Sequence, residues 1–235
     1  NITAMTMDSV SRYCAVVRDE EILLLKIPSF REVDSIRFGS SSQIALSGDG
    51  KNLLMVNEDS GDIAVYNTEE RKFRWMGEME FSELCTVDCS CDGSLGLVQY
   101  DLCSLIVFEM ATGRGLFNRR EPRLAFNQVC FTPDGRHIAA PSNNGSGTEY
   151  NDIDIFEVED FARTEHISGA AKGGMNGMAF PKKTGMVFTS SWDRHIYLAE
   201  RGSDRREGLQ WHDHAPTALS VMADGSHVIS GDQEG

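Results

Sequence analysis

The sequence of 235 residues contains no long hydrophobic run and no common catalytic signature. None of its apolar segments approaches the roughly 18 residues of a membrane-spanning helix, so we expect no membrane insertion. The motifs Gly-x-Ser-x-Gly, His-Glu-x-x-His and Gly-x-x-x-x-Gly-Lys-Ser/Thr are absent. These motifs mark serine hydrolases, zinc peptidases and phosphate-binding loops. We therefore predict no catalytic, metal-binding or cofactor-binding residues and no bound cofactor.

Positive charge is also scarce, because 22 basic residues face 36 acidic ones and the formal net charge is −14. A field of that sign repels phosphate backbones, so we expect no direct contact with nucleic acid. Two small basic groups interrupt the acidic background, Arg119-Arg120 with Arg123, and Arg205-Arg206. We expect them at the outer rim of the fold, solvated or docked to an acidic segment of a partner.

The six cysteines follow neither a compact disulfide pattern nor a zinc-binding pattern. Cys85 and Cys89 share one face of a predicted strand but lie about 13 Å apart at ~3.3 Å per residue, too far to bind one zinc ion. Cys89 aligns with the core positions of Phe131 and Phe180, which favours packing. A chain of this size has enough core without disulfides, so we expect reduced cysteines and an intracellular location, cytoplasmic or nuclear.

Short β-type segments recur along the chain with a period near forty residues. Equivalent turns, four of them Asp-Gly pairs, end at positions separated by 39, 43, 42, 50 and 40 residues: Ser11, Gly50, Gly93, Gly135, Gly185 and Gly225. A strand rich in β-branched residues precedes each turn and another follows it. A third strand, such as DIAVYN or HIYLAE, follows in five repeats, and a weaker fourth comes after it.

Four short strands every 40–45 residues are typical of a β-propeller blade, whose faces are buried by neighbouring blades. We predict an all-β chain that forms one propeller domain over residues 1–235, with five complete or nearly complete four-stranded blades and part of a sixth. A propeller must close or leave sheet edges exposed, so we further predict a fragment of a seven-bladed propeller, truncated at both ends.

The segment VFTSSWDRHIYLAE of the fifth repeat resembles the WD-repeat pattern V-L-A-S-G-S-x-D-G-T-I-K-V-W-D almost column by column. The chain is therefore similar to a divergent member of the WD-repeat family. In this alignment Ala199-Glu200 occupies the Trp-Asp slot, so Trp192-Asp193 lies one turn earlier. The resemblance implies that Asp193 stabilises that turn and that Trp192 is a bulky side chain on the loops.

The family also has a Gly-His pair before each blade, and its His joins a buried hydrogen-bonded tetrad. Counting thirteen residues back from Gly225 gives His212, whereas the same count gives Arg37, Glu80 and Pro122 in other blades. The fifth blade has an extra residue, so its count starts from Phe180 and gives Ala171. His212 therefore resembles the structural His. A zinc or acid–base site in Trp211-His212-Asp213-His214 is the less favoured alternative. The Asp-Gly turns give further structural positions, Asp49, Asp92, Asp134 and Asp224.

One repeat is longer because residues 143–151 are inserted between its second and third strands. Such loops lie on the face where WD-repeat propellers usually bind partners, and exposed aromatic and Arg side chains are common interface anchors. We therefore predict a partner-binding face formed by Trp192, Arg194, Asn143, Asn144, Tyr150, Trp211 and His214. A flexible loop without function remains the alternative for the insertion.

The function expected from these features is a non-catalytic protein–protein interaction scaffold, a subunit of a larger intracellular assembly whose partners are other proteins. A propeller-type hydrolase or lactonase with a channel metal is one alternative, and a reader of peptide marks is another. The predicted innermost strands carry almost no charge, with Asp88 as the main exception. That lack of charge disfavours a channel metal, which needs several carboxylate or His ligands at one level.

Overall fold

The computed structural model describes residues 2–120, 128–142, 150–203, 205–222, 224–232 and 234, without the side chains of Cys85 and Tyr150. All regular structure in these residues is β-strand. None of them belongs to a helix long and apolar enough to cross a membrane. The strands form five four-stranded antiparallel sheets and one two-stranded sheet, which are blades of a β-propeller, as predicted.

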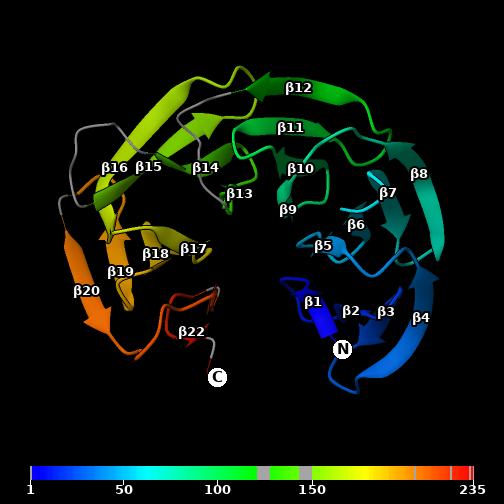
Figure 1. The fold of residues 1–235 in the computed structure, drawn as a ribbon, viewed down its shortest axis with the longest axis horizontal. Coiled ribbons are helices and arrows are strands. Elements are labelled where there is room, and N and C mark those ends of the chain that lie inside the picture. Colours follow the sequence, from blue (N-terminus) through cyan, green and yellow to red (C-terminus); the bar gives the residue numbers. More distant parts are fainter. Residues whose placement is uncertain are drawn as a thin grey trace. The chain divides into compact units, whose positions relative to one another are not determined.

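The chain divides into two compact units, residues 1–120 and 121–235. The first unit contains three blades whose strands pair in sequence order (Figure 1). Their bounds are β1 Ile2–Met7, β2 Tyr13–Arg18, β3 Glu21–Lys26, β4 Arg31–Arg37, β5 Ser42–Leu46, β6 Asn52–Asn57, β7 Asp62–Asn67, β8 Lys72–Glu78, β9 Leu84–Cys89, β10 Leu95–Tyr100, β11 Ser104–Glu109 and β12 Gly115–Arg120.

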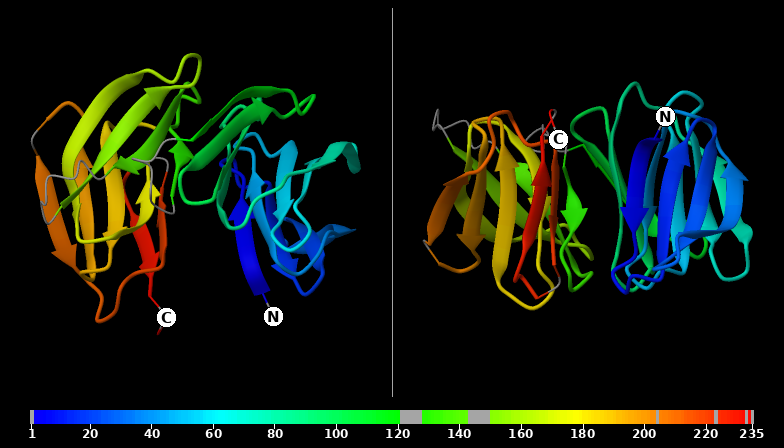
Figure 2. Two further views of the ribbon diagram at one scale, coloured as in Figure 1. Left: turned by 45° about the horizontal axis from the view of Figure 1, so that its top comes forward. Right: turned by 90° about the horizontal axis from the view of Figure 1, so that it is seen from below.

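The second unit contains two four-stranded blades and a two-stranded sheet. Their bounds are β13 Cys130–Phe131, β14 His137–Ser142, β15 Tyr150–Glu157, β16 Arg163–Lys172, β17 Met175–Ala179, β18 Met186–Ser191, β19 His195–Glu200, β20 Arg206–Gln210, β21 Ala218–Val221 and β22 Val228–Gly231. Two strands differ from the regular pattern, since β13 has two residues and β16 has ten. Figure 2 shows the two-stranded sheet in red.

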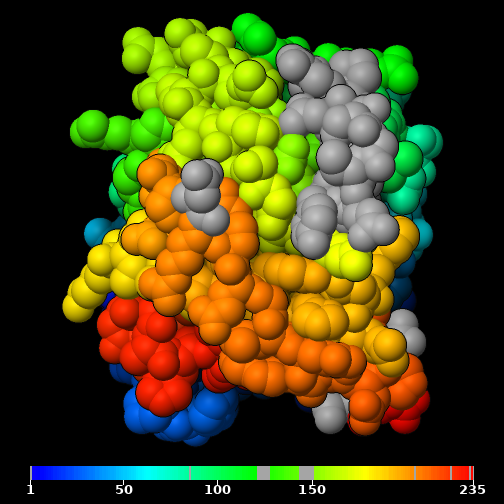
Figure 3. Space-filling view, turned by 90° about the vertical axis from the view of Figure 1, so that its left-hand side faces the viewer, coloured from blue at the N-terminus to red at the C-terminus, as the bar shows by residue number. Residues whose placement is uncertain are grey.

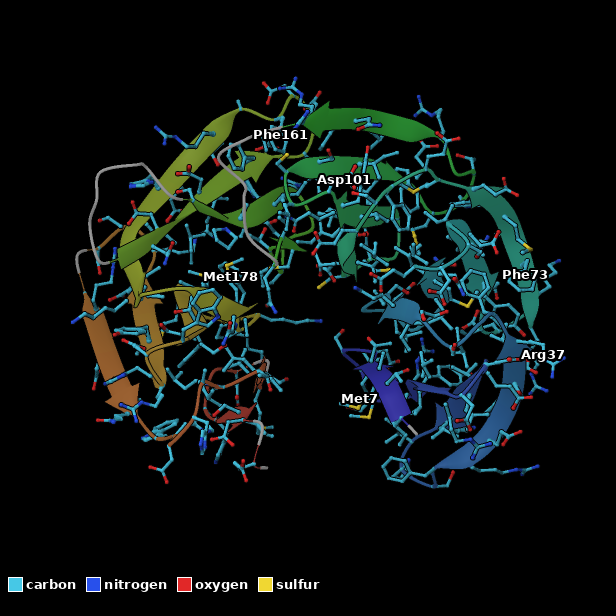
Figure 4. The ribbon with its side chains drawn as sticks, viewed as in Figure 1. Met7, Arg37, Phe73, Asp101, Phe161 and Met178 are labelled. Atoms are coloured by element: carbon cyan, nitrogen blue, oxygen red, sulfur yellow. The ribbon has the colours of Figure 1, made fainter. Side chains whose placement is uncertain are left out.

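Position within a blade determines how strongly each strand is buried. In the second blade every residue of β6 is buried, because neighbouring blades cover both faces of this central strand. The outermost strand β8 is mostly exposed, and it carries Phe73 at the outer side of the blade (Figure 4). Apolar residues therefore run continuously in the central strands and become sparse in the fourth, which explains the weaker signal of the fourth strands in the sequence.

Apolar cores lie between consecutive blades rather than within them. Leu53 and Met55 of β6 pack with Ala15 and Val17 of the first blade. The alternate residue Leu54 packs with Val98 of the third blade. In the second unit Ile153 of β15 packs with Val187 of β18 and Ala199 of β19. Successive residues of a strand point to opposite faces, so one strand contributes to two cores.

The turns between first and second strands have the conformation that the Asp-Gly pairs predict. Gly50, Gly93, Gly135 and Gly225 all have positive φ, between 68° and 73°. Glycine adopts this region without the steric cost that a Cβ atom imposes. In the first blade Ser11 occupies the same place with φ of 55°. The repeat spacing thus located these turns correctly.

Candidate functional site

The antiparallel order of the strands sorts the connections of a blade to its two ends. Turns between first and second strands lie at one end, and connections between second and third strands lie at the other. The connection to the next blade also starts at that other end, which we call the loop end. In the second unit it includes residues 173–174, 192–194 and 211–217. These segments contain Trp192, Arg194, Trp211 and His214 of the predicted partner-binding face.

Trp192 projects from the loop end but is held in one orientation. Its side chain is 68% exposed, while its backbone N–H donates to the carbonyl oxygen of Gly174 at 2.9 Å. The indole Nε1–H donates to Oδ1 of Asn176 on β17. A Cβ atom on Gly174 would lie 2.5 Å from Cδ2 of the indole, so the ring lies directly against the Gly174 backbone. An exposed aromatic ring held in this way needs little ordering when a partner binds.

Asn176 joins the Trp192 turn to the segment that leads into the sixth blade. While its Oδ1 accepts from Trp192, its Nδ2 donates to the carbonyl oxygen of Pro216 at 3.0 Å. Thr217 N–H then donates to the carbonyl oxygen of Gly231 at 2.9 Å. Asn176 is not among the predicted site residues, although a polar residue inside the otherwise apolar segment MNGMAF is a visible signal.

His212 anchors the segment that carries Trp211 and His214. Its Nδ1 lies 3.0 Å from Oδ2 of Asp232, and its Nε2 lies 2.7 Å from Oγ of Ser230. The pKa of Asp232 is lowered, mainly by a hydrogen bond from the backbone N–H of Glu234 and also by His212. On either side of this anchor Trp211 is 58% exposed and His214 is exposed. The structure thus places His212 in a side-chain network with two residues of the last β-hairpin.

Asp193 and Arg194 complete the turn that follows Trp192. Oδ1 of Asp193 accepts from His195 N–H at 3.2 Å, and Oδ2 accepts from the Tyr197 hydroxyl at 2.6 Å. Arg194 has φ of 74° and is exposed, and its N–H donates to the carbonyl oxygen of Ser191 at 3.1 Å. Asp193 therefore braces the turn, while Arg194 projects from it beside Trp192.

The four aspartates of the Asp-Gly turns share one hydrogen-bonding pattern at the opposite end of the blades. Each accepts from the backbone N–H two residues later, with distances of 3.0, 3.0, 2.8 and 2.9 Å for Asp49, Asp92, Asp134 and Asp224. The first three also accept, at 2.7 Å, from the hydroxyl two residues earlier. These aspartates are tied to their own turns and away from the loop end.

The first blade replaces this arrangement with a different aspartate. Asp8 precedes the turn, and its Oδ1 accepts from the backbone N–H of Arg12 at 2.7 Å and of Tyr13 at 3.2 Å. Its side chain is fully buried. The repeat spacing predicts the turn at Ser11 but not this role of Asp8, because the aspartate lies two residues before the position it has in the other turns.

The insertion of the fourth blade lies largely outside the described residues. Asn143 and Asn144 fall within residues 143–149, and Tyr150 is described only as the first backbone position of β15. Their membership of the partner-binding face stays a prediction. The structure therefore describes Trp192, Arg194, Trp211 and His214 of that face.

Residues with metal-binding chemistry do not gather in the described part of the chain. No group of three or more His, Cys, Asp or Glu side chains there has a geometry that could hold a metal ion. The thiol of Cys89 is buried, lies 3.3 Å from the carbonyl oxygen of Ala45, and has a pKa raised well above its ordinary value, chiefly by burial. A thiol in this environment is a packing residue rather than a nucleophile.

Comparison with known proteins finds similarity in fold rather than in sequence. No family model matches the chain, and no curated protein matches it. Many solved structures do match its fold. One of them is hydrazine synthase of Kuenenia stuttgartiensis, with a TM-score of 0.74 over 97% of this chain and 72% of that chain, at 11% identity. At this identity the similarity establishes the fold alone, since one fold supports many functions.

Proposed function

We propose that the chain is a divergent WD-repeat propeller that acts as a non-catalytic protein–protein interaction scaffold in an intracellular assembly. The observation that carries this proposal is the fixed, exposed indole of Trp192 at the loop end of the fifth blade. Tryptophan is among the residues enriched at the positions that contribute most binding energy in protein interfaces. Stacked blades support it on a stiff frame, as a recognition surface requires.

The network around His212 supports the WD-repeat part of the proposal. Its contacts with Ser230 and Asp232 join a His that precedes the blade to polar residues at the end of the second strand. In the fifth blade Ala171 occupies the His position, and the Thr189 hydroxyl donates instead to the carbonyl oxygen of Ala170 at 2.5 Å. The sixth blade thus has the His212 side-chain network, whereas the fifth blade has a side-chain-to-backbone hydrogen bond in its place. We expect such differences between blades when the repeats of a chain have diverged.

Other proteins are the partners that fit this surface. Trp192 and Trp211 offer apolar area, and Arg194 adds a donor group that can bind carboxylates or backbone carbonyls. The net charge of −14 disfavours binding to a phosphate backbone. The proposed face therefore carries two exposed tryptophans and an exposed arginine at the loop ends of consecutive blades, and these residue types are common at protein–protein interfaces.

Quantitative affinity purification from cells tests the proposal. We expect Trp192→Ala to reduce the recovery of specific partners at least about tenfold, the effect of losing roughly 1.4 kcal/mol of binding energy. Met76→Ala is the matched control, because Met76 is an exposed apolar residue on the outermost strand β8. An unchanged partner set with Trp192→Ala, or an equal loss with Met76→Ala, would argue against the proposed surface.

A further inference from the structure

A groove of about 370 Å³ lies on the outer side of the second unit. Its lining residues are Gly169 of β16, Tyr197 of β19, and Arg206, Glu207 and Gly208 of β20. The strands β16 and β20 are the outermost strands of neighbouring blades, coloured yellow-green and orange in Figure 3. The volume is at the lower end of the range for ligand pockets, which suits a ligand of one or two residues.

Arg206 is fixed in this groove by backbone carbonyl groups. Its Nε donates to Ser168 O at 2.6 Å, and its Nη1 donates to Ser203 O at 2.9 Å and to Arg205 O at 2.7 Å. In the described residues Nη2 makes no hydrogen bond. Among the described residues the partners of the guanidinium are thus neutral carbonyl groups rather than a carboxylate, and Nη2 retains two N–H groups that can donate.

The side chains of Arg206 and its neighbour Glu207 lie on opposite faces of strand β20. Arg206 is paired with Ala199 and Gly208 with Tyr197, so these four side-chain positions share one face of the blade. Ala199 belongs to the core between the fourth and fifth blades, so this face is turned toward the fourth blade. Glu207 points to the opposite face, where its carboxylate lies 3.8 Å from Nη2 of Arg205. Arg206 and Glu207 both line the groove, and Arg206 is the one whose side chain lies on the face turned toward the fourth blade.

The ring of Tyr197 forms an apolar floor next to this charge. Its hydroxyl donates to Asp193, and its ring stacks on His195 with centroids 5.7 Å apart. A Cβ atom on Gly208 would lie 3.0 Å from Cε1 of the ring, so the missing side chain leaves this surface open. Gly169, on the other wall, has no atom within 4 Å of its Cβ position. The two glycines thus leave space above an immobilised aromatic ring.

We propose that this groove binds the C-terminal carboxylate of a partner chain that ends in an apolar residue. The carboxylate accepts hydrogen bonds from Nη2 of Arg206, and the terminal side chain packs on Tyr197. An apolar C-terminal residue carries its carboxylate and its apolar side chain on the same Cα atom. It can therefore contact the positive charge of Arg206 and the adjacent ring of Tyr197 at the same time. Internal Asp and Glu residues lack an apolar group of their own next to the carboxylate. A phosphate needs several donors, and only one guanidinium nitrogen is free.

The proposal goes beyond the interaction surface at Trp192, because the groove lies on the rim and its ligand is of a different kind. Its test uses N-acetyl-Gly-Gly-Phe with a free carboxylate and the same peptide with a C-terminal amide. We expect calorimetric titration to show that the free acid binds at least about tenfold more tightly than the amide. Arg206→Gln should reduce this ratio to about one. Arg205→Gln makes the same charge change on the opposite face and should leave the ratio intact.

A second measurement keeps the test valid if Arg206→Gln unfolds the rim, since Arg206 also joins two blades through Ser168. In NMR spectra of the unmodified protein, the free acid should shift the amide signals of Gly169 and Gly208, and the amide peptide should not. Equal affinity of acid and amide would overturn the proposal. So would equal binding of N-acetyl-aspartate amide or inorganic phosphate, or shifts confined to residues outside the groove.

Discussion

The backbone of Gly174 lies directly against the indole ring of Trp192, and a Cβ atom on Gly174 would be 2.5 Å from Cδ2 of that ring. The ring is further held by the hydrogen bond from its Nε1 to Asn176. Trp192 follows β18, whereas Gly174 and Asn176 lie just before and within β17. The orientation of Trp192 therefore depends on the correct pairing of these two strands. The indole is thus exposed and ordered at the same time.

Gly174→Ala therefore tests the orientation of Trp192 without removing it. The added methyl group must displace the indole, because real Cβ atoms do not approach other atoms so closely. We expect a change in tryptophan fluorescence and a loss of partner binding similar to that of Trp192→Ala. Gly115→Ala is the control, since its Cβ position has no atom within 4 Å. Normal partner binding by Gly174→Ala would mean that the held orientation does not matter.

His212→Ala should destabilise the loop end of the sixth blade. The substitution leaves Ser230 and Asp232 without their shared hydrogen-bond partner, so the free energy of unfolding should fall. Hydrogen exchange should accelerate at residues 211–217, which lose their side-chain contacts with Ser230 and Asp232. His214→Ala is a suitable control because His214 is exposed in the same segment. Equal exchange rates in the two variants would contradict the anchoring role of His212.

The turn aspartates make stability depend on pH in the acid range. The pKa of Asp92 is lowered because hydrogen bonds from Ser94 and Ser90 outweigh the opposing effect of burial, and the pKa of Asp224 is lowered by Ser226. A folded-state pKa below the unfolded value of about 3.9 contributes stability above that pH. This contribution disappears as the pH falls through the folded-state pKa.

We therefore expect the free energy of unfolding to fall below about pH 4 through these groups. Ser94→Ala removes a hydroxyl that donates to Asp92 at 2.7 Å. It should lower stability at neutral pH by up to about 1 kcal/mol and weaken the acid dependence. Ser40→Ala, at an exposed serine, should change neither. Denaturant titrations between pH 2 and 7 measure both effects, and parallel curves for Ser94→Ala and the unmodified protein would refute the account of the turns.

Leu54 and Ile229 occupy equivalent positions in the second strands of the second and sixth blades but differ in burial. Leu54 is fully buried in the core shared with the third blade, whereas Ile229 is 70% exposed. We expect Leu54→Ala to lower the free energy of unfolding by about 2–5 kcal/mol and Ile229→Ala to change it by less than about 0.5 kcal/mol. Chemical denaturation measures both, and similar losses would contradict the proposed packing between blades.

The period of the turns was sufficient to predict the blades. Asp-Gly pairs at Gly50, Gly93, Gly135 and Gly225 are local signals, because a tight turn needs a residue with positive φ. The continuous apolar runs of the central strands were equally readable. The number of blades in the complete propeller stays a prediction, as do the partner and the role of residues 143–151.

The candidate site was predictable only where one residue carries its own signal. Trp192 and Trp211 are large apolar residues in turn sequences, so their exposure could be expected. Asn176 could not be assigned a role, because its two hydrogen bonds join segments 16 and 40 residues away. Arg206 was recognised only as part of a basic pair. The register between β19 and β20, which the sequence does not specify, decides that Arg206 rather than Glu207 pairs with Ala199 and faces the fourth blade.

The central claim, that partners bind at the loop end around Trp192, is tested most directly by site-specific photo-crosslinking. A photoreactive phenylalanine is introduced at Trp192 or Trp211, and for comparison at Met76 or Leu116, which are exposed on the outermost strands β8 and β12. We predict cross-links to the same partner from positions 192 and 211 and none from positions 76 and 116. Cross-links to that partner from positions 76 and 116 alone would contradict the claim.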